Sequence, residues 1–199
     1  MPSDHPRTLL IACGALAEEV LASLPEEERA AIEVTCLPAK LHNRPALIPD
    51  AMRVKIRANR DKYDRILALY GDCGTGGRLD EMLREEGVER IAGAHCYEFY
   101  TGAAEFEAIA EAEPATFYLT DYLARHFDRL IIEGLGIDRH PELLPLYFGN
   151  YEKLLYLSQI EDEVLQEKAK AAAERLSLQY EYRFTGLSGL QDFIRQKTE

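Results

Sequence analysis

The sequence predicts an α/β fold: a doubly wound, mostly parallel sheet of about five strands, with helices on both faces and a helical cover. Short apolar runs alternate with segments of helical spacing in the first half of the chain, and glycine or proline separates them. Parallel neighbouring strands need long crossovers, which are usually helices. The length of 199 residues fits one domain, so we expect residues 1–199 to form a single α/β domain.

The first half of the chain is expected to repeat a strand–helix unit four times. Apolar or β-rich runs predict strands at residues 8–12, 32–37, 65–70 and 89–94. Segments with apolar residues at helical intervals follow at residues 17–24, 49–63, 79–86 and from residue 103. The alternation predicts four parallel strands.

The second half reads mainly as helix. No clear strand is expected between residues 116 and 173, where patterns at 118–132, 142–160 and 162–176 predict the helical cover. Residues 178–184 alternate apolar with polar side chains, which favours an exposed edge strand, and residues 187–194 return to helix. We expect this edge strand to complete the five-stranded sheet.

Charge and hydropathy exclude several classes of function. The chain has 35 acidic and 23 basic side chains and a formal net charge of −12, which repels nucleic acid and anionic lipid. No apolar run is long enough for a membrane span, and the first residues lack the order of a signal peptide. We therefore expect a cytoplasmic protein with no nucleic-acid or membrane partner, whose four cysteines are not disulfide-bonded.

Cysteine and histidine residues gather where the predicted strands end. These residues are Cys13, Cys36, Cys73 and the adjacent His95 and Cys96, and His42 follows Cys36 by six residues in a proline-bounded loop. Open parallel sheets bind ligands beyond the carboxyl ends of their strands. Thiolate and imidazole are ligands for zinc or iron, so the predicted metal ligands are Cys36, His42, Cys73 and Cys96. The chain has no Cys-x-x-Cys pair, and the metal remains one of several alternatives.

The glycine-rich segment at residues 71–77 is the second chemical signal. It lacks the lysine and terminal hydroxyl of a phosphate-binding P-loop. Its glycines predict close approach of the backbone to a ligand, with Gly74, Gly76 and Gly77 as cofactor-binding positions and Cys73 as an accessible thiolate. Asp72, His95 and Glu98 are the candidate catalytic residues for proton transfer, although an acidic residue after a strand is also an ordinary helix cap.

Three motifs together resemble a known family. Residues 36–45 read CLPAKLHNRP, residues 70–77 read YGDCGTGG and residues 95–100 read HCYEFY. The chain resembles an uncharacterised bacterial and archaeal family, called domain of unknown function 1638. The resemblance extends from about residue 13 to residue 156. The resemblance implies a link to one-carbon and corrinoid-dependent methyl transfer, where thiolate-bound zinc activates a thiol.

Three hypotheses follow for function. The first is a metal-dependent enzyme that acts on a small-molecule substrate or cofactor, with methyl transfer or a related thiol reaction as the narrower form. The second is a non-catalytic carrier that passes a metal or cofactor to a protein partner. The third is a metal-free enzyme in which Cys73 is a redox or covalent nucleophile.

Overall fold

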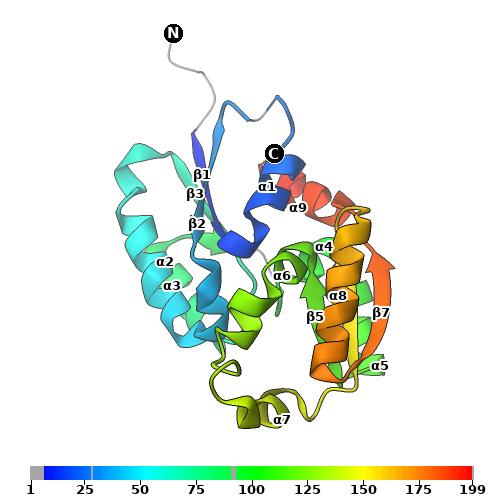
Figure 1. Cartoon of the computed structure of the whole chain (residues 1–199). Coiled ribbons are helices and arrows are strands. Elements are labelled where there is room, and N and C mark those ends of the chain that lie inside the picture. Colours follow the sequence, from blue (N-terminus) through cyan, green and yellow to red (C-terminus); the bar gives the residue numbers. More distant parts are fainter. Residues whose placement is uncertain (1–6, 28, 91–92, 199) are drawn as a thin grey trace. The chain divides into compact units, whose positions relative to one another are not determined.

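The computed structural model describes residues 7–27, 29–90 and 93–198. The α/β class is confirmed, because two sheets of parallel strands alternate with helices (Figure 1). The chain divides into two compact units: Met1–Cys96 with Leu190–Glu199, and Tyr97–Gly189. The expectation of one domain stays a prediction. Within the described ranges, no helix is both long and apolar enough to cross a membrane.

The first unit contains a four-stranded sheet in the order β2-β1-β3-β4. Its strands are β1 (Thr8–Cys13), β2 (Ile32–Leu37), β3 (Arg65–Leu69) and β4 (Glu89–Arg90). β1 pairs in parallel with both β2 and β3, and all six of its residues are buried. The chain first moves from β1 to one side and then crosses to the other, so the direction of winding reverses between β1 and β3.

The reversal places helices on both faces of this sheet, since right-handed crossovers in opposite directions pass over opposite faces. Figure 1 shows α1 (Ala17–Ser23) on one side of the strands and both α2 (Ile48–Arg57) and α3 (Arg78–Glu86) on the other. Short 3-10 helices occupy the connections, at Gly14–Leu16, Ala39–Asn43, Pro45–Leu47 and Arg60–Lys62. The chain ends in α9 (Ser188–Thr198).

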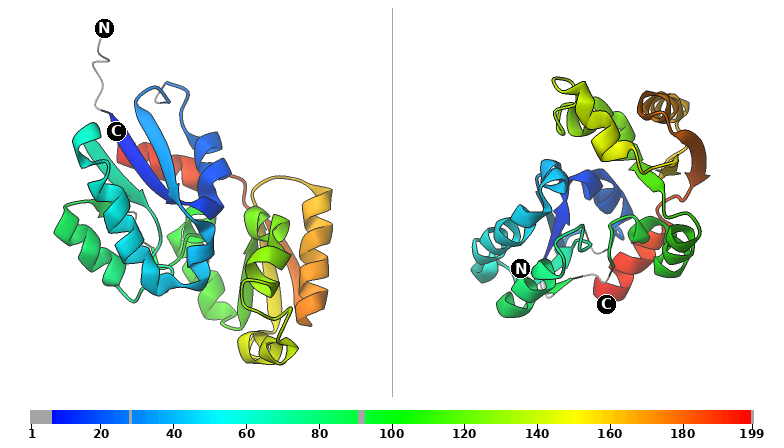
Figure 2. Two further views of the ribbon diagram at one scale, coloured as in Figure 1. Left: turned by 60° about the vertical axis from the view of Figure 1, so that its left-hand side comes forward. Right: turned by 90° about the horizontal axis from the view of Figure 1, so that it is seen from below.

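The second unit contains a three-stranded sheet in the order β5-β6-β7. Its strands are β5 (Thr116–Thr120), β6 (Lys153–Ser158) and β7 (Gln179–Phe184). Figure 2 shows α8 (Glu163–Leu176) running alongside these strands. The remaining helices are α4 (Glu98–Thr101), α5 (Ala103–Ala112), α6 (Asp121–Arg125), a π-helix (Asp128–Ile132), a 3-10 helix (Pro141–Leu143) and α7 (Leu144–Phe148).

Two strands lie where helices were expected, and one sheet is replaced by two. β5 overlaps the start of the predicted helix at 118–132, and β6 lies inside the predicted helix at 142–160. β6 is buried on both faces: Leu154 and Tyr156 pack in the cluster that contains α8, whereas Leu155 and Leu157 pack against Ile109 of α5. A strand buried on both faces gives a continuous apolar run without period 2, which cannot be distinguished from a buried helix by pattern.

The fifth predicted strand also has a different neighbour. β7 pairs with β6 and not with any strand of the first sheet. The fourth predicted strand, at 89–94, is limited to the two residues of β4 among those described, and residues 91 and 92 lie outside the described ranges.

Candidate functional site

All four predicted cysteine positions lie toward the carboxyl edge of the first sheet. β1 ends at Cys13, and Cys36 is the penultimate residue of β2. Cys73 lies in the loop after β3 and Cys96 in the loop after β4. The winding reverses between β1 and β3, and such a point in a parallel sheet is where ligands bind. The topology therefore favours this edge as a candidate site.

Backbone hydrogen bonds join the loop after β3 to the loop after β4. The Asp72 amide donates to the Gly93 carbonyl at 3.0 Å, and the Cys73 amide donates to the Ala94 carbonyl at 2.9 Å. These bonds continue the pairing of β3 and β4 beyond the strands themselves. They fix the backbone of Cys73 next to the segment that leads to Cys96.

Close backbone contact brings the two thiols together. A Cβ atom on Gly71 would lie 2.7 Å from the His95 carbonyl carbon and 2.8 Å from the Cys96 amide nitrogen, so only glycine fits there. The Gly71 amide donates to Cys96 Sγ at 3.5 Å. The Cys73 and Cys96 Sγ atoms lie 3.3 Å apart, within hydrogen-bonding distance for sulfur. The two loops thus form a thiol pair, Cys73 and Cys96.

The two thiols of the pair have opposite acidities. The hydrogen bond from Cys96 lowers the pKa of Cys73 below its ordinary value, despite burial, and Arg90 contributes in the same direction. The hydrogen bond to Cys73 and burial raise the pKa of Cys96 well above its ordinary value. Cys73 is therefore the more acidic thiol of the pair and Cys96 the less acidic one, which favours the arrangement in which Cys96 donates and Cys73 accepts.

The backbone at Cys73 is in a conformation that side chains rarely adopt. Its φ is 49°, in the left-handed region, and it precedes three glycines with φ of 84°, 64° and 82° at Gly74, Gly76 and Gly77. Glycine adopts this region at no steric cost, but cysteine does not. Such conformations cluster at functional sites, where the surrounding structure holds them in place.

The Asp72 carboxylate forms hydrogen bonds with three groups of the glycine loop that follows it. It accepts hydrogen bonds from the Thr75 hydroxyl, from the Gly76 amide at 3.0 Å and from the Gly77 amide at 2.9 Å. Burial acts to raise the pKa of Asp72, but these hydrogen bonds outweigh it and lower the pKa. The amides of Gly76 and Gly77, expected to face a ligand, are thus engaged by Asp72. Proton transfer by Asp72 and cofactor binding by Gly74, Gly76 and Gly77 stay predictions.

Arg90 connects the two loops and was not identified from the sequence. Its guanidinium forms a two-point ion pair with Asp80 of α3, in which one contact is 2.7 Å, and only 12% of its side chain is exposed. It also donates to the carbonyls of Gly93 at 3.0 Å and Tyr70 at 3.4 Å. A single arginine at the end of a short strand carries no sequence signal for this role.

The other two cysteines are less acidic. Burial raises the pKa of Cys13 to about 11, and the hydroxyl of the buried Tyr70 forms a hydrogen bond with this thiol. Burial also raises the pKa of Cys36, against an opposing effect of Lys55. The pKa values of Cys13 and Cys36 are thus shifted in the direction opposite to that of Cys73. No sequence pattern marked Tyr70 as functional.

The predicted histidine and glutamate residues have different environments. His42 lies in the 3-10 helix Ala39–Asn43 and its side chain reaches solvent, yet neighbouring protein atoms desolvate its ring and lower its pKa, and His95 adds to the effect. His95 is exposed. Glu98 is the first residue of α4 in the second unit. Catalytic roles for His95 and Glu98 stay predictions.

The predicted metal ligands do not converge as a set. Across residues 7–27, 29–90 and 93–198, no three histidine, cysteine, aspartate or glutamate side chains are grouped so that they could hold a metal ion. Cys73 and Cys96 are paired, but neither Cys36 nor His42 joins them to form a group of three. Strand ends bring residues to one edge, whereas coordination requires side chains about 2 Å from a shared ion.

Comparison with known families agrees with the three sequence motifs. A model described as "Protein of unknown function (DUF1638)" matches residues 36–194. The chain belongs to this family. The DUF1638 match begins at Cys36, later than the resemblance that the motifs indicate, and extends beyond residue 156 through the second unit.

Other comparisons add no functional information. A search of curated proteins gave no match. Among solved structures, the chain is similar to ornithine carbamoyltransferase from Pyrococcus furiosus, with 16% identity and a TM-score of 0.30. The match covers 90% of this chain, which spans 55% of the length of that chain. A TM-score this low supports no conclusion about activity.

Proposed function

We propose that this DUF1638 protein is a thiol-dependent enzyme in which Cys73 is the nucleophile and Cys96 its proton donor. The observation that supports the proposal is the 3.3 Å separation of the two Sγ atoms, together with the lowered pKa of Cys73 and the raised pKa of Cys96. A thiolate is the reactive form of cysteine, and an adjacent donor that stabilises it increases the fraction present at neutral pH.

The pair provides a balanced group-transfer step. The Cys73 sulfur donates an electron pair to an electrophilic carbon of a small-molecule substrate, and the bond from that carbon to its leaving group breaks. The leaving group takes the bonding electrons and receives the Cys96 proton. Once Cys73 carries the transferred group, it has no negative charge to raise the pKa of Cys96, so the proton is released more readily. A small thiol or water then gives its proton to the Cys96 thiolate and displaces Cys73, which leaves as a thiolate, so both sulfur atoms return to their starting forms.

The thiol pair also supports a second candidate function, that of a protein that binds zinc or iron. Two sulfur atoms 3.3 Å apart supply two soft ligands, and the lowered pKa of His42 keeps its imidazole neutral, the form that binds metals. A bound metal would lower the pKa of a thiol or water and serve either an enzyme of one-carbon or methyl transfer or a carrier. This candidate requires further ligands that the described geometry does not bring together.

Selective alkylation tests the first candidate. The untagged, reduced protein is treated near neutral pH with less than one equivalent of iodoacetamide, and the modified cysteine is identified by peptide mass spectrometry. We expect Cys73 to take up the label, since the other thiols are protonated. Cys73→Ser should lose the fast reaction and Cys36→Ser should keep it. Preferential labelling of any other cysteine in the folded protein would exclude Cys73 as the nucleophile.

Elemental analysis of the same preparation separates the two candidates. Metal-free, folded protein with a reactive Cys73 supports the thiol enzyme. Near-stoichiometric zinc or iron that is lost in both Cys73→Ser and Cys96→Ser favours the metal candidate, and tight binding without turnover favours its carrier form.

A further inference from the structure

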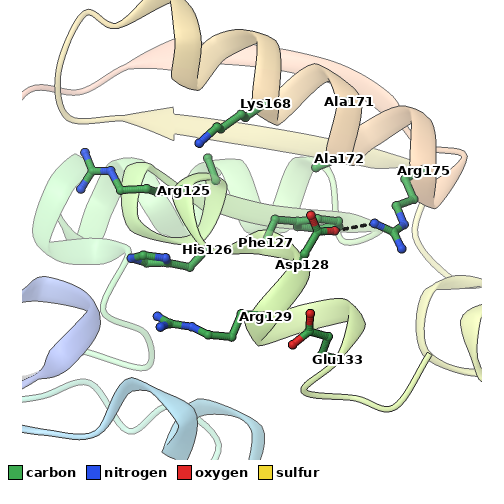
Figure 3. Close-up of a pocket in the computed structure, with 11 residues that line it drawn as sticks. Arg125, His126, Phe127, Asp128, Arg129, Glu133, Lys168, Ala171, Ala172 and Arg175 are labelled. Carbon is green, nitrogen blue, oxygen red and sulfur yellow. Dashed lines mark hydrogen bonds and ion pairs between the residues drawn. The ribbon is translucent and has the colours of Figure 1, made fainter. Parts of the chain in front are cut away.

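The second unit contains a cavity of about 410 Å³ that the thiol chemistry does not use. One wall is the segment that runs from the end of α6 through the π-helix, and the other is α8 (Figure 3). All the lining residues belong to the second unit. Its volume is within the range of small-molecule sites.

Basic groups from both walls gather at one side of this cavity. Figure 3 shows the nitrogen-bearing ends of Arg125, His126, Arg129 and Lys168 together, whereas the ion pair between Asp128 and Arg175 lies on the opposite side. Four arginine and lysine side chains line the cavity against two carboxylates, in a chain whose formal net charge is −12. The local charge is thus opposite in sign to that of the whole protein.

Two of these cations have no counter-ion among the side chains that the structure describes. Among the residues that the structure describes, no carboxylate forms an ion pair with Arg129 or Lys168. Lys170, two residues further along α8, pairs with Glu167. Cations that line a cavity without a partner are available to an anionic ligand.

The walls of the cavity are held by buried polar contacts. Asp121, the first residue of α6, is 2% exposed and accepts hydrogen bonds from the Tyr156 hydroxyl at 2.6 Å and from the Ile160 amide at 2.9 Å. The side chain of Asp162 caps the start of α8. The π-helix between them widens the turn that carries Arg129, and such helices often occur at functional sites. A site on anchored walls binds without a large ordering cost.

We propose that this cavity binds the phosphate group of a small, hydroxylated phosphate monoester. A phosphate dianion presents oxygens in several directions, which matches arginine and lysine donors from two different elements. The cavity has room for more than the phosphate, and the carboxylates of Asp128 and Glu133 line it where attached hydroxyl groups can donate. The proposal goes beyond the thiol chemistry and does not depend on it.

Calorimetric titration of the full chain with inorganic phosphate and with glycerol 3-phosphate tests the proposal. We expect saturable 1:1 binding of both, tighter for the ester, and weaker at higher ionic strength. Arg129→Gln and Lys168→Gln should each weaken binding by about tenfold, the effect of losing one hydrogen bond to a charged group. Cys73→Ser should bind like wild type, which keeps this test separate from that of the thiol pair.

Two matched variants control for general charge. Lys170→Gln on α8 and Arg139→Gln remove one positive charge each from exposed side chains that do not line the cavity, and should leave the affinity unchanged. Absence of saturable binding, or equal weakening by the cavity variants and the control variants, would overturn the proposal. Binding of inorganic phosphate that is as tight as binding of the ester would overturn the assignment of a monoester.

Discussion

Replacing Cys96 with alanine should slow alkylation of Cys73 about tenfold at neutral pH and shift the pH profile of the reaction to higher pH. The hydrogen bond from Cys96 is the main cause of the lowered Cys73 pKa, and a hydrogen bond to a charged group contributes about 1.5 kcal/mol or more. Without it, burial raises the Cys73 pKa and less thiolate is present. The measurement is the rate of iodoacetamide modification across the pH range, followed at Cys73 by mass spectrometry.

Two further variants distinguish the hydrogen bond from a general disturbance of the site. Cys36→Ala removes a cysteine from the same sheet edge and should leave the Cys73 profile unchanged. Cys96→Ser restores a donor and should recover part of the rate. If Cys96→Ala gives the wild-type profile, the thiol pair is not what activates Cys73.

Replacing Arg90 with methionine should lower the free energy of unfolding by about 2 kcal/mol and also slow the alkylation of Cys73. The change leaves Asp80 without its partner and the Gly93 carbonyl without one of its donors, and the loss of a partly buried ion pair has a cost of this order. The Gly93 carbonyl also accepts a hydrogen bond from the Asp72 amide, so the loop that contains Cys73 should become less ordered. Urea unfolding and the alkylation rate together measure both effects.

Arg65→Met is the matched control for this prediction. Arg65 begins β3 and forms an ion pair with Glu89 at 3.9 Å, but both side chains are exposed, and such pairs contribute little. The substitution should change stability by less than about 0.5 kcal/mol and leave Cys73 reactive. Equal effects of the two substitutions would contradict the positioning role of Arg90.

The first three strands could be predicted because each apolar run ends at a glycine or proline that begins a loop. The gathering of the cysteines at one sheet edge could then be predicted, since parallel strands place all their carboxyl ends together. β6 could not be predicted in the same way, because its residues Leu154–Leu157 are buried on both faces and their pattern shows no strand period.

The sequence indicated that the cysteines would lie toward one sheet edge, but it did not indicate the contacts that they make there. Strand ends indicated that Cys73 and Cys96 would lie near each other, and the structure pairs them. Residue types alone could not show that Cys36 and His42 stay outside a metal-binding group, since that depends on the course of the loops. The contribution of Arg90 to both loops arises from tertiary contacts that have no periodic pattern in sequence.

The most direct test of the account is the pKa of Cys73 in the folded protein. The pH dependence of thiolate ultraviolet absorbance is measured for wild type and for Cys73→Ser, and the thiolate transition at lowest pH, which only wild type should show, is assigned to Cys73. A midpoint below the ordinary thiol value of about 8.5 is expected, as the hydrogen bond from Cys96 requires. A midpoint at or above that value would contradict the assignment of Cys73 as the thiolate of the pair.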